Sequence, residues 1–177
     1  MPDYAVTAIG RDRPGIVAAI SGALHELGGN LEDSHMSILR GHFAVMLIVR
    51  VPSVAAEEQL AAKLGAVRDE LELEALTLER VDELADPRPQ PTHVLSVYGA
   101  DRQGIVAGVT AGLAGLGVNI TDLSTRLAGA EESPIYAMLV EVDLGDVPSS
   151  EVEHAVSQAA GPGELEVSLR ELDAEAL

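Results

Sequence analysis

Apolar residues along the first half of the chain follow one pattern of predicted elements. The apolar segment 4–9 predicts a strand, and apolar residues spaced three and four apart over residues 16–27 predict a helix with one face turned inward. Gly28 and Gly29 follow that helix and end it. Two further strands, residues 30–39 and 42–51, are joined by a tight turn at Arg40 and Gly41.

A second helix and a last strand complete this pattern. Pro14 lies where the first turn of a helix tolerates proline, because the N–H group that proline lacks has no partner there. The second helix is indicated by apolar residues at helical spacing, and the last strand by Leu76 and Leu78, which alternate with polar residues. The residues of the helical stripe are Leu60, Leu64, Val67 and Leu71.

The same pattern returns in the second half of the chain. Residues 10–18 read GRDRPGIVA and residues 99–107 read GADRQGIVA, which are identical at seven of nine positions. A repeat of this kind defines the folding unit, so the sequence predicts two copies of one domain. The offset of 89 residues also relates Gly28 to Gly117, Asn30 to Asn119 and Asp33 to Asp122.

The second copy differs from the first in its middle hairpin. Residues 129–134 lengthen the turn, so Phe43 aligns with Tyr136 at an offset of 93. Ser150 and Glu153 predict a capping box at the start of the second helix. Alternating apolar residues over 165–169 predict the last strand.

A proline-rich segment separates the two copies. Residues 86–91 read DPRPQP, and three alternating prolines cannot continue a helix or a central strand. We therefore expect a first domain over residues 1–85, a stiff linker over 86–91 and a second domain over 92–177.

The order strand–helix–strand–strand–helix–strand, twice over, predicts the fold class. Each copy is expected to be a ferredoxin-like α+β sandwich of the βαββαβ type, an antiparallel sheet with two helices on one face. The strands at 43–49 and 135–140 are apolar at successive positions, whereas a half-solvated strand alternates. We expect a sister domain or another chain to cover their second face, and we also expect the chain to form a homodimer.

Charge and composition exclude several function classes. The formal net charge is -18 and aromatic residues make up 2% of the chain, so we expect no direct binding to nucleic acid or to anionic membranes. Cysteine is absent, which removes thiolate chemistry and disulfides. No signal peptide is visible and the longest apolar run, residues 43–49, is too short to span a bilayer, so a cytoplasmic protein is expected.

The repeated glycine-containing loops are the first candidate site. Free N–H groups at a helix start favour a carboxylate, and Gly15 and Gly104 allow close approach of a ligand to the backbone. Asp12 and Asp101 could pair with a ligand ammonium group or cap the helix. The alternative is that these loops serve only helix capping and turn geometry.

Two asparagines are the second candidate. Asn30 and Asn119 each follow the helix, and a side-chain amide offers both a donor and an acceptor to a zwitterionic amino acid. Alternatively, each stabilises a turn with positive φ. For Asp33 and Asp122 we favour a surface or loop-anchoring role.

No enzymatic or metal-binding pattern is visible. The five histidines include no i, i+4 pair, and nucleophile elbows, Walker loops and dinucleotide-binding fingerprints are absent. We therefore expect no catalytic residues, no metal site and no cofactor.

Both copies resemble a known family. The segment DRPGIV from Asp12, followed by a helix and Gly-x-Asn-Leu from Gly28, resembles the ACT domain, and DRQGIV from Asp101 with Gly117-x-Asn119 repeats it. Two such domains in tandem resemble the family that includes the glycine-cleavage-system transcriptional repressor. The resemblance implies regulatory binding of a small ligand, commonly an amino acid, at domain interfaces, and action through a partner protein.

The leading hypothesis is accordingly an amino-acid sensor that acts through a protein partner. A protein-interaction scaffold with vestigial sites and, less favoured, an enzyme are the alternatives. The predicted site lies where the loop before the first helix meets the start of the next strand, with the second copy repeating it. The first copy would use Asp12, Arg13, Pro14, Gly15, Ile16 and Asn30, and the second Asp101, Arg102, Gly104, Ile105 and Asn119.

Overall fold

The computed structural model describes residues 1–53, 55–84, 90–130, 133–159 and 165–172. The chain divides into two compact units, unit 1 over Met1–Leu84 and unit 2 over Ala85–Leu177. Residues 86–89 of the expected linker lie outside the described residues, so the stiff linker stays a prediction.

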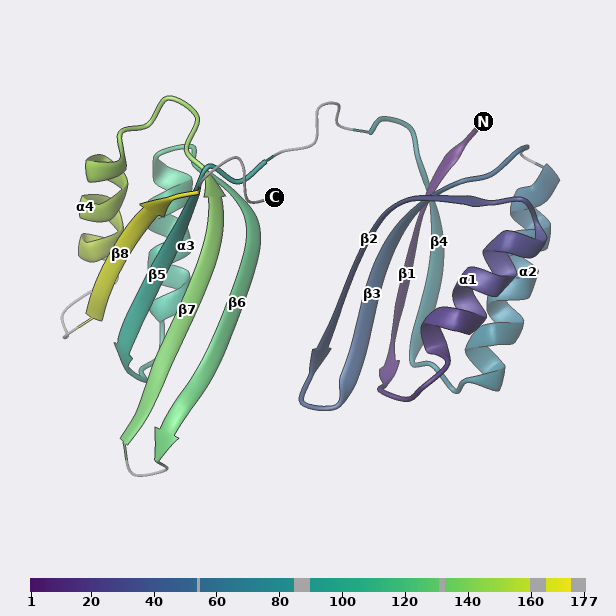
Figure 1. Cartoon of the computed structure of the whole chain (residues 1–177), viewed down its shortest axis with the longest axis horizontal. Coiled ribbons are helices and arrows are strands. Elements are labelled where there is room, and N and C mark those ends of the chain that lie inside the picture. The colour runs from purple at the N-terminus through teal and green to yellow at the C-terminus, as the bar shows by residue number, and fades with distance from the viewer. Residues whose placement is uncertain (54, 85–89, 131–132, 160–164, 173–177) are drawn as a thin grey trace. The chain divides into compact units, whose positions relative to one another are not determined.

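Unit 1 has the predicted order of elements (Figure 1). Its strands form one antiparallel sheet in the order β2-β3-β1-β4. Arg40 and Gly41, both with positive φ, form the tight turn between β2 and β3, as a two-residue hairpin turn of type I′ requires. The elements are β1 Asp3–Arg11, α1 Ile16–Glu26, β2 Asn30–Leu39, β3 His42–Arg50, α2 Ala55–Glu70 and β4 Ala75–Val81.

Unit 2 repeats this order and the equivalent sheet, β6-β7-β5-β8. In each unit both helices pack on the same face of the sheet, which confirms two βαββαβ domains (Figure 1). The longer hairpin of unit 2 is confirmed in its strands, although residues 131–132 at its turn lie outside the described residues. The elements are β5 His93–Ala100, α3 Ile105–Gly115, β6 Asn119–Ala130, β7 Ser133–Asp143, α4 Ser149–Ala159 and β8 Leu165–Glu171.

The core of each unit lies between the sheet and its two helices. Alternate residues of β1 and β3 point to the helices because successive side chains of a strand face opposite sides. Tyr4, Val6 and Leu47 are buried there against Ile20 of α1 and Leu60 of α2. The aliphatic residues that form the predicted helical stripes are thus the ones that fill the core.

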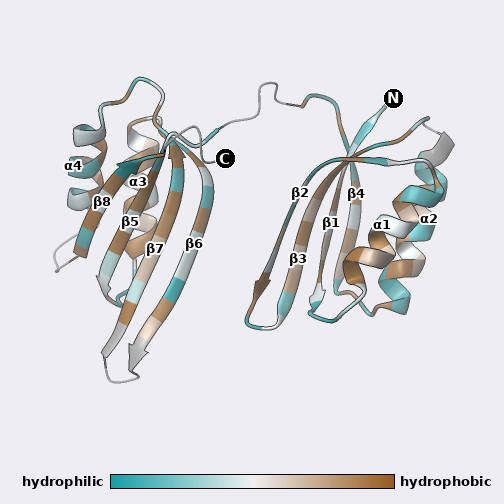
Figure 2. Ribbon diagram, in the orientation of Figure 1, coloured by the Kyte–Doolittle hydropathy of each residue, from teal (hydrophilic) through white to brown (hydrophobic). Residues whose placement is uncertain are grey.

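The outer face of each sheet does not match the expectation that both faces are covered. Met46 of β3 is 51% exposed and Leu139 of β7 is 43% exposed, because within each unit both helices lie on the other face. Figure 2 shows hydrophobic residues along the strands of both sheets. Cover of these faces by the sister domain or by another chain therefore stays a prediction, because the fold of a single unit does not provide it.

Two local predictions are wrong. The carboxylate of Glu153 accepts a hydrogen bond from the backbone N–H of Leu169 at 3.1 Å, so it ties α4 to β8 and does not close a capping box. Pro14 lies ahead of the first turn, because α1 begins at Ile16 after Gly15 in the left-handed conformation. In the first case a contact with a distant strand competed with the local capping interaction, and in the second the left-handed Gly15 delayed the start of the helix.

Candidate functional site

The loop between β1 and α1 presents free backbone donors. Gly15 precedes α1 with φ 100°, and no side chain caps the helix. The first helical hydrogen bond runs from Ala19 N–H to Gly15 O at 2.9 Å, so the N–H groups of Ile16, Val17 and Ala18 have no acceptor among the described residues. These donors, at the positive end of the helix dipole, suit an anion such as a carboxylate.

Asp12 does not cap this helix. Its side chain makes no capping bond, and its backbone N–H donates instead to the carbonyl oxygen of Gly41 at 2.9 Å. The loop is thereby joined to the turn between β2 and β3. The helix-capping interpretation of Asp12 is therefore wrong, and its exposed carboxylate is available to a ligand.

Unit 2 builds the same helix start. Gly104 has φ 90°, no side chain caps α3, and Gly108 N–H donates to Gly104 O at 2.8 Å. Gln103 stands where unit 1 has Pro14, yet the two glycines adopt the same conformation. Proline is therefore not what sets this geometry.

An arginine lies beside each helix start. Arg13 and Arg102 are both partly buried. The terminal nitrogen Nη2 of Arg13 is buried without a hydrogen-bond partner among the described residues. An unsatisfied buried donor is unfavourable, so an acceptor brought by a ligand would stabilise it.

Asn30 and Asn119 are exposed at the first residues of β2 and β6. The amide of Asn30 donates to Glu32 Oε1 at 2.8 Å. Neither asparagine has positive φ, so the interpretation as turn residues in that conformation is wrong. Asp33 Oδ1 accepts a hydrogen bond from the next backbone N–H, at Ser34, which fits a local structural role.

Ion pairs hold the sheet together beside Asn30. The Arg50 guanidinium lies 2.9 Å from Asp3 Oδ1 and 3.2 Å from Glu32 Oε1. Its hydrogen bond to Asp3, helped by the charges of both carboxylates, raises the pKa of Arg50. Glu32, which accepts the hydrogen bond from Asn30, therefore also stabilises the sheet through its ion pair with Arg50.

The two halves of the predicted site lie at opposite ends of the unit. Asn30 is in register with Arg50, which pairs with Asp3 at the start of β1, whereas Arg11 at the end of β1 pairs with His42. Eight residue steps separate the ends of β1, or about 27 Å at the rise of an antiparallel strand. The prediction that the loop and Asn30 form a single site within one unit is therefore wrong. Helix α1 runs back along the sheet and so separates the loop from Asn30 (Figure 1).

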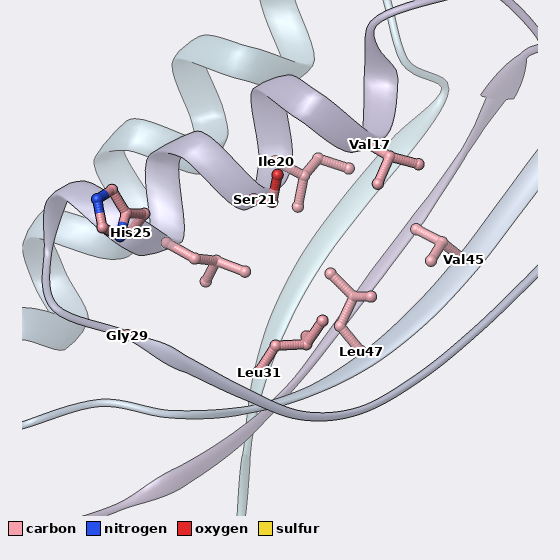
Figure 3. Close-up of a pocket in the computed structure, with 9 residues that line it drawn as sticks. Val17, Ile20, Ser21, His25, Gly29, Leu31, Val45 and Leu47 are labelled. Atoms are coloured by element: carbon pink, nitrogen blue, oxygen red, sulfur yellow. The ribbon is translucent and has the colours of Figure 1, made fainter.

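A cavity lies beside α1 on the helix side of the sheet, and no motif in the sequence predicted it (Figure 3). Its volume is about 90 Å³, and its walls are mostly aliphatic with Ser21 and His25 among the polar groups. Val17 belongs both to the lining and to the first turn of α1, where the free N–H groups lie. The lining residues are Val17, Ile20, Ser21, Leu24, His25, Gly29, Leu31, Val45 and Leu47.

A serine and a histidine meet where β5 approaches α4. Ser149 Oγ lies 3.3 Å from His93 Nε2, and the other ring nitrogen lies 3.0 Å from Thr92 Oγ1. Thr92 Oγ1 also accepts a hydrogen bond from Leu144 N–H at 3.1 Å. A hydroxyl in the place of an orienting carboxylate does not match a catalytic triad, so these contacts anchor the start of α4.

Metal and membrane sites were also sought. Within the described residues, no group of three or more His, Asp or Glu side chains could hold a metal ion. No helix in that part of the chain is long and apolar enough to cross a membrane.

Comparison with known proteins relates both units to one family. The model of the ACT domain matches residues 4–77 and 92–170. The UPF0237 protein MK1213 of Methanopyrus kandleri is 40% identical over 67 residues, covering 38% of this chain and 68% of that protein. The phosphoserine phosphatase SerB2 of Mycobacterium tuberculosis is 25% identical over 172 residues, covering 94% of this chain and 40% of the phosphatase.

Solved structures share the tandem arrangement. An unknown protein from Galdieria sulphuraria superposes with a TM-score of 0.78 at 28% identity, covering 97% of this chain and 99% of that one. A candidate glycine cleavage system transcriptional repressor superposes with a TM-score of 0.72 at 18% identity, covering 97% of each chain, which shows the fold alone. The chain thus belongs to the ACT domain family, with one ACT domain in each unit.

Proposed function

We propose that this chain is a regulatory protein that binds an amino acid and acts through a protein partner. The observation that carries the proposal is the start of α1, where the N–H groups are free and where Arg13, three residues before Ile16, has its Nη2 buried without a partner among the described residues. A ligand carboxylate supplies the acceptor that both lack, in the field of the helix dipole. The exposed Asp12 carboxylate beside them suits a ligand ammonium group.

The output is a change in how the partner binds. A ligand shifts a protein between two arrangements only by its difference in affinity for them, so binding must favour one arrangement. A protein partner fits better than nucleic acid, because a net charge of -18 repels phosphates. We propose that the chain works in the cytoplasm and catalyses no reaction itself, with no cofactor or metal. The matched phosphatase is more than twice as long as the segment that it shares with this chain.

We propose that the chain forms a homodimer. Four exposed apolar positions of unit 1 have an exposed apolar residue at the equivalent position of unit 2. Water-facing positions have no reason to stay apolar in both repeats unless a partner covers them. Within one unit the β1–α1 loop lies far from Asn30. In the homodimer that we propose, Asn30 of one copy would lie near this loop of the other copy. The pairs are Ile9 and Tyr98, Val17 and Val106, Ile38 and Leu127, and Met46 and Leu139.

A screen of the twenty amino acids by thermal shift tests the proposal. A ligand that binds only the folded state raises Tm by mass action, by about 2.7 kcal/mol of stabilisation at a concentration one hundred times Kd. We expect at least one amino acid to raise Tm in a saturable way, with Kd then measured by calorimetry. If none does at 10 mM or about that concentration, the sensor proposal is wrong.

The second candidate is an interaction scaffold with vestigial ligand sites. The repeated exposed apolar positions favour it, since they serve a protein contact without any ligand. The same screen separates the two functions. A scaffold would self-associate or bind its partner with the same affinity whether or not amino acids are present.

A further inference from the structure

The outer face of the sheet in unit 1, which carries no helix, has side chains of alternating size that fit a second copy of the same face (Figure 1). We infer that two copies of the chain associate through this face, with each strand antiparallel to the same strand of the other copy. The inference rests on the homodimer of the proposed function, and it names the surface that forms the dimer and the way its side chains meet.

The sheet register arranges the side chains of this face in four rows that cross the strands. Successive side chains of a strand point to opposite sides, so Met46 and its neighbours in register lie on the face opposite buried Leu47. The second and third rows form the middle of the face. The rows, from the first residues of β1 to its last, are Asp33, Ile48, Ala5 and Glu79; His35, Met46, Thr7 and Thr77; Ser37, Ala44, Ile9 and Ala75; and Leu39, His42 and Arg11.

Large and small side chains alternate along both central strands. On β3 the large Met46 follows the small Ala44, and on β1 the large Ile9 follows the small Thr7. Met46 is 51% exposed and Ile9 is 46% exposed. A hollow of about 250 Å³ has all four residues in its lining. The middle of the face therefore combines projecting apolar side chains with a recess that can receive such side chains.

A two-fold axis perpendicular to the strands brings large residues onto small ones. With the axis between the second and third rows, each of these rows faces the other row of the second copy, and each strand faces the same strand of that copy. Met46 then lies over Ala44 of the other copy, and Ile9 lies over Thr7. Interdigitation of this kind is how two sheets pack face to face, with about 10 Å between them and a small rotation of the strands.

Unit 2 preserves this alternation of sizes with different residues. On β7 the large Leu139 follows the small Ala137, and on β5 the large Tyr98 follows the small Ser96. Leu139 and Tyr98 are also exposed. Side chains that met only solvent would have no reason to keep their sizes while their identities changed, so the alternation indicates a packed contact.

The middle of the unit 1 face is also where two copies repel each other least. Each copy carries a net charge of -18, so most of its surface opposes contact with a second copy. The second and third rows hold one histidine and no Asp, Glu, Lys or Arg. In unit 2 the row of Tyr98 also holds Arg126 and Glu166, and both would lose hydration in such a contact. We therefore assign the contact to unit 1.

Charges at the two ends of the face are complementary under the same axis. The first row holds Asp33 and Glu79, and the fourth row holds Arg11. The axis places the fourth row of one copy over the first row of the other, so Arg11 lies near two carboxylates of the other copy. His42, also in the fourth row, lies 4.0 Å from Glu74 of its own unit, so we assign the attraction to Arg11.

The size of the face predicts a weak dimer. Four strands and the eight residue steps of β1 give a flat area of about 14 Å by 27 Å, or roughly 400 Å² per copy. A stable complex buries about 800 Å² per partner, so we expect the balance of monomer and dimer to shift with protein concentration.

Sedimentation equilibrium of the full chain over a range of concentrations tests this contact. Ala44→Met fills the recess, and because the axis repeats the contact, this overpacking should weaken association by at least about thirtyfold. The double variant Ala44→Met with Met46→Ala moves the large residue and the recess together, and should regain at least about tenfold of that loss. Ala62→Met, on the exposed side of α2, is the matched control and should leave the dissociation constant unchanged.

The outcomes distinguish this contact from the homodimer itself. A monomer at every concentration would contradict both the homodimer and this inference, and the amino-acid screen would still test the sensor. A dimer unaffected by Ala44→Met or by Met46→Ala would keep the homodimer and overturn this surface. A double variant as weak as Ala44→Met would overturn the pairing of two unit 1 faces, since Met46 would then meet a surface other than its own. Met46→Ala alone decides about the surface if Ala44→Met does not fold.

Discussion

Gly15→Ala tests whether the start of α1 needs glycine for its backbone conformation or for space. Gly15 has φ 100°, and a Cβ atom built on it meets no atom within 4 Å. The added methyl group therefore clashes with nothing, and its cost is that of an L-residue in a left-handed conformation, about 1–2 kcal/mol. Gly22 also has open space but lies inside α1, so Gly22→Ala is a matched control that should stabilise unit 1 by about 0.5–1 kcal/mol.

Urea unfolding of the full chain, followed by circular dichroism, measures both changes. In thermal unfolding of a domain the size of unit 1, the same loss of about 1–2 kcal/mol should lower Tm by about 4–16 °C. Gly104→Ala should cost a similar amount in unit 2, because Gly104 has φ 90°. If Gly15→Ala proves as stable as Gly22→Ala, the folded structure does not hold the left-handed conformation, and the free N–H groups lose the geometry that we assign to them. Valine at position 15 would add the strain of a β-branched residue, so it cannot serve as a clean test of ligand contact.

Four further predictions concern the core, the site and the assembly. Tyr4→Phe should lower the free energy of unfolding by about 1.5–3 kcal/mol, because it removes the 2.6 Å hydrogen bond from the buried hydroxyl to the Glu57 carboxylate. That hydrogen bond, helped by burial, raises the pKa of Tyr4. Its contribution to the free energy of unfolding is therefore complete below about pH 10 and is lost as the pH rises through the higher pKa of the folded state. Urea unfolding at pH 8 and pH 11 should show this loss in the unmodified protein and not in Tyr4→Phe. Arg13→Gln should weaken amino-acid binding by about 10- to 100-fold in calorimetry, the range for a hydrogen bond to a charged group, and equal affinity would remove Arg13 from the site. Asn30→Ala should weaken binding by about 1–3 kcal/mol only at concentrations where the protein is dimeric, and a loss that does not depend on concentration would contradict a site shared between copies. Met46→Glu should shift sedimentation toward the monomer, because it places a charge on the exposed apolar face, and an unchanged dimer would move the interface elsewhere.

Most of the fold was predictable because each unit repeats the same local signals. The spacing of apolar residues gave β2 at residues 30–39 without error and α1 within one residue of its end. Gly41 marked the hairpin turn, since a two-residue turn of this type needs positive φ. These features depend on nearest neighbours along the chain, which a sequence displays directly.

The site was predictable only in its separate parts. The sequence indicated the glycine at each helix start, but not that a strand followed by a returning helix puts Asn30 at the other end of the sheet. Glu153 matched the spacing of a capping box, yet Leu169, sixteen residues later, took its carboxylate. The cavity depends on Gly29 and Val45 being small at positions that meet only in the folded unit.

The hydrogen bond from Asp12 N–H to Gly41 O has a mechanical consequence. It links the loop that precedes α1 to the tip of the β2–β3 hairpin, so the two segments cannot fluctuate independently. Any ligand that orders this loop also slows amide hydrogen exchange at the tip. Leu39, beside that tip, is 70% exposed, so in the function that we propose the hairpin tip is where a partner protein would contact the ordered loop.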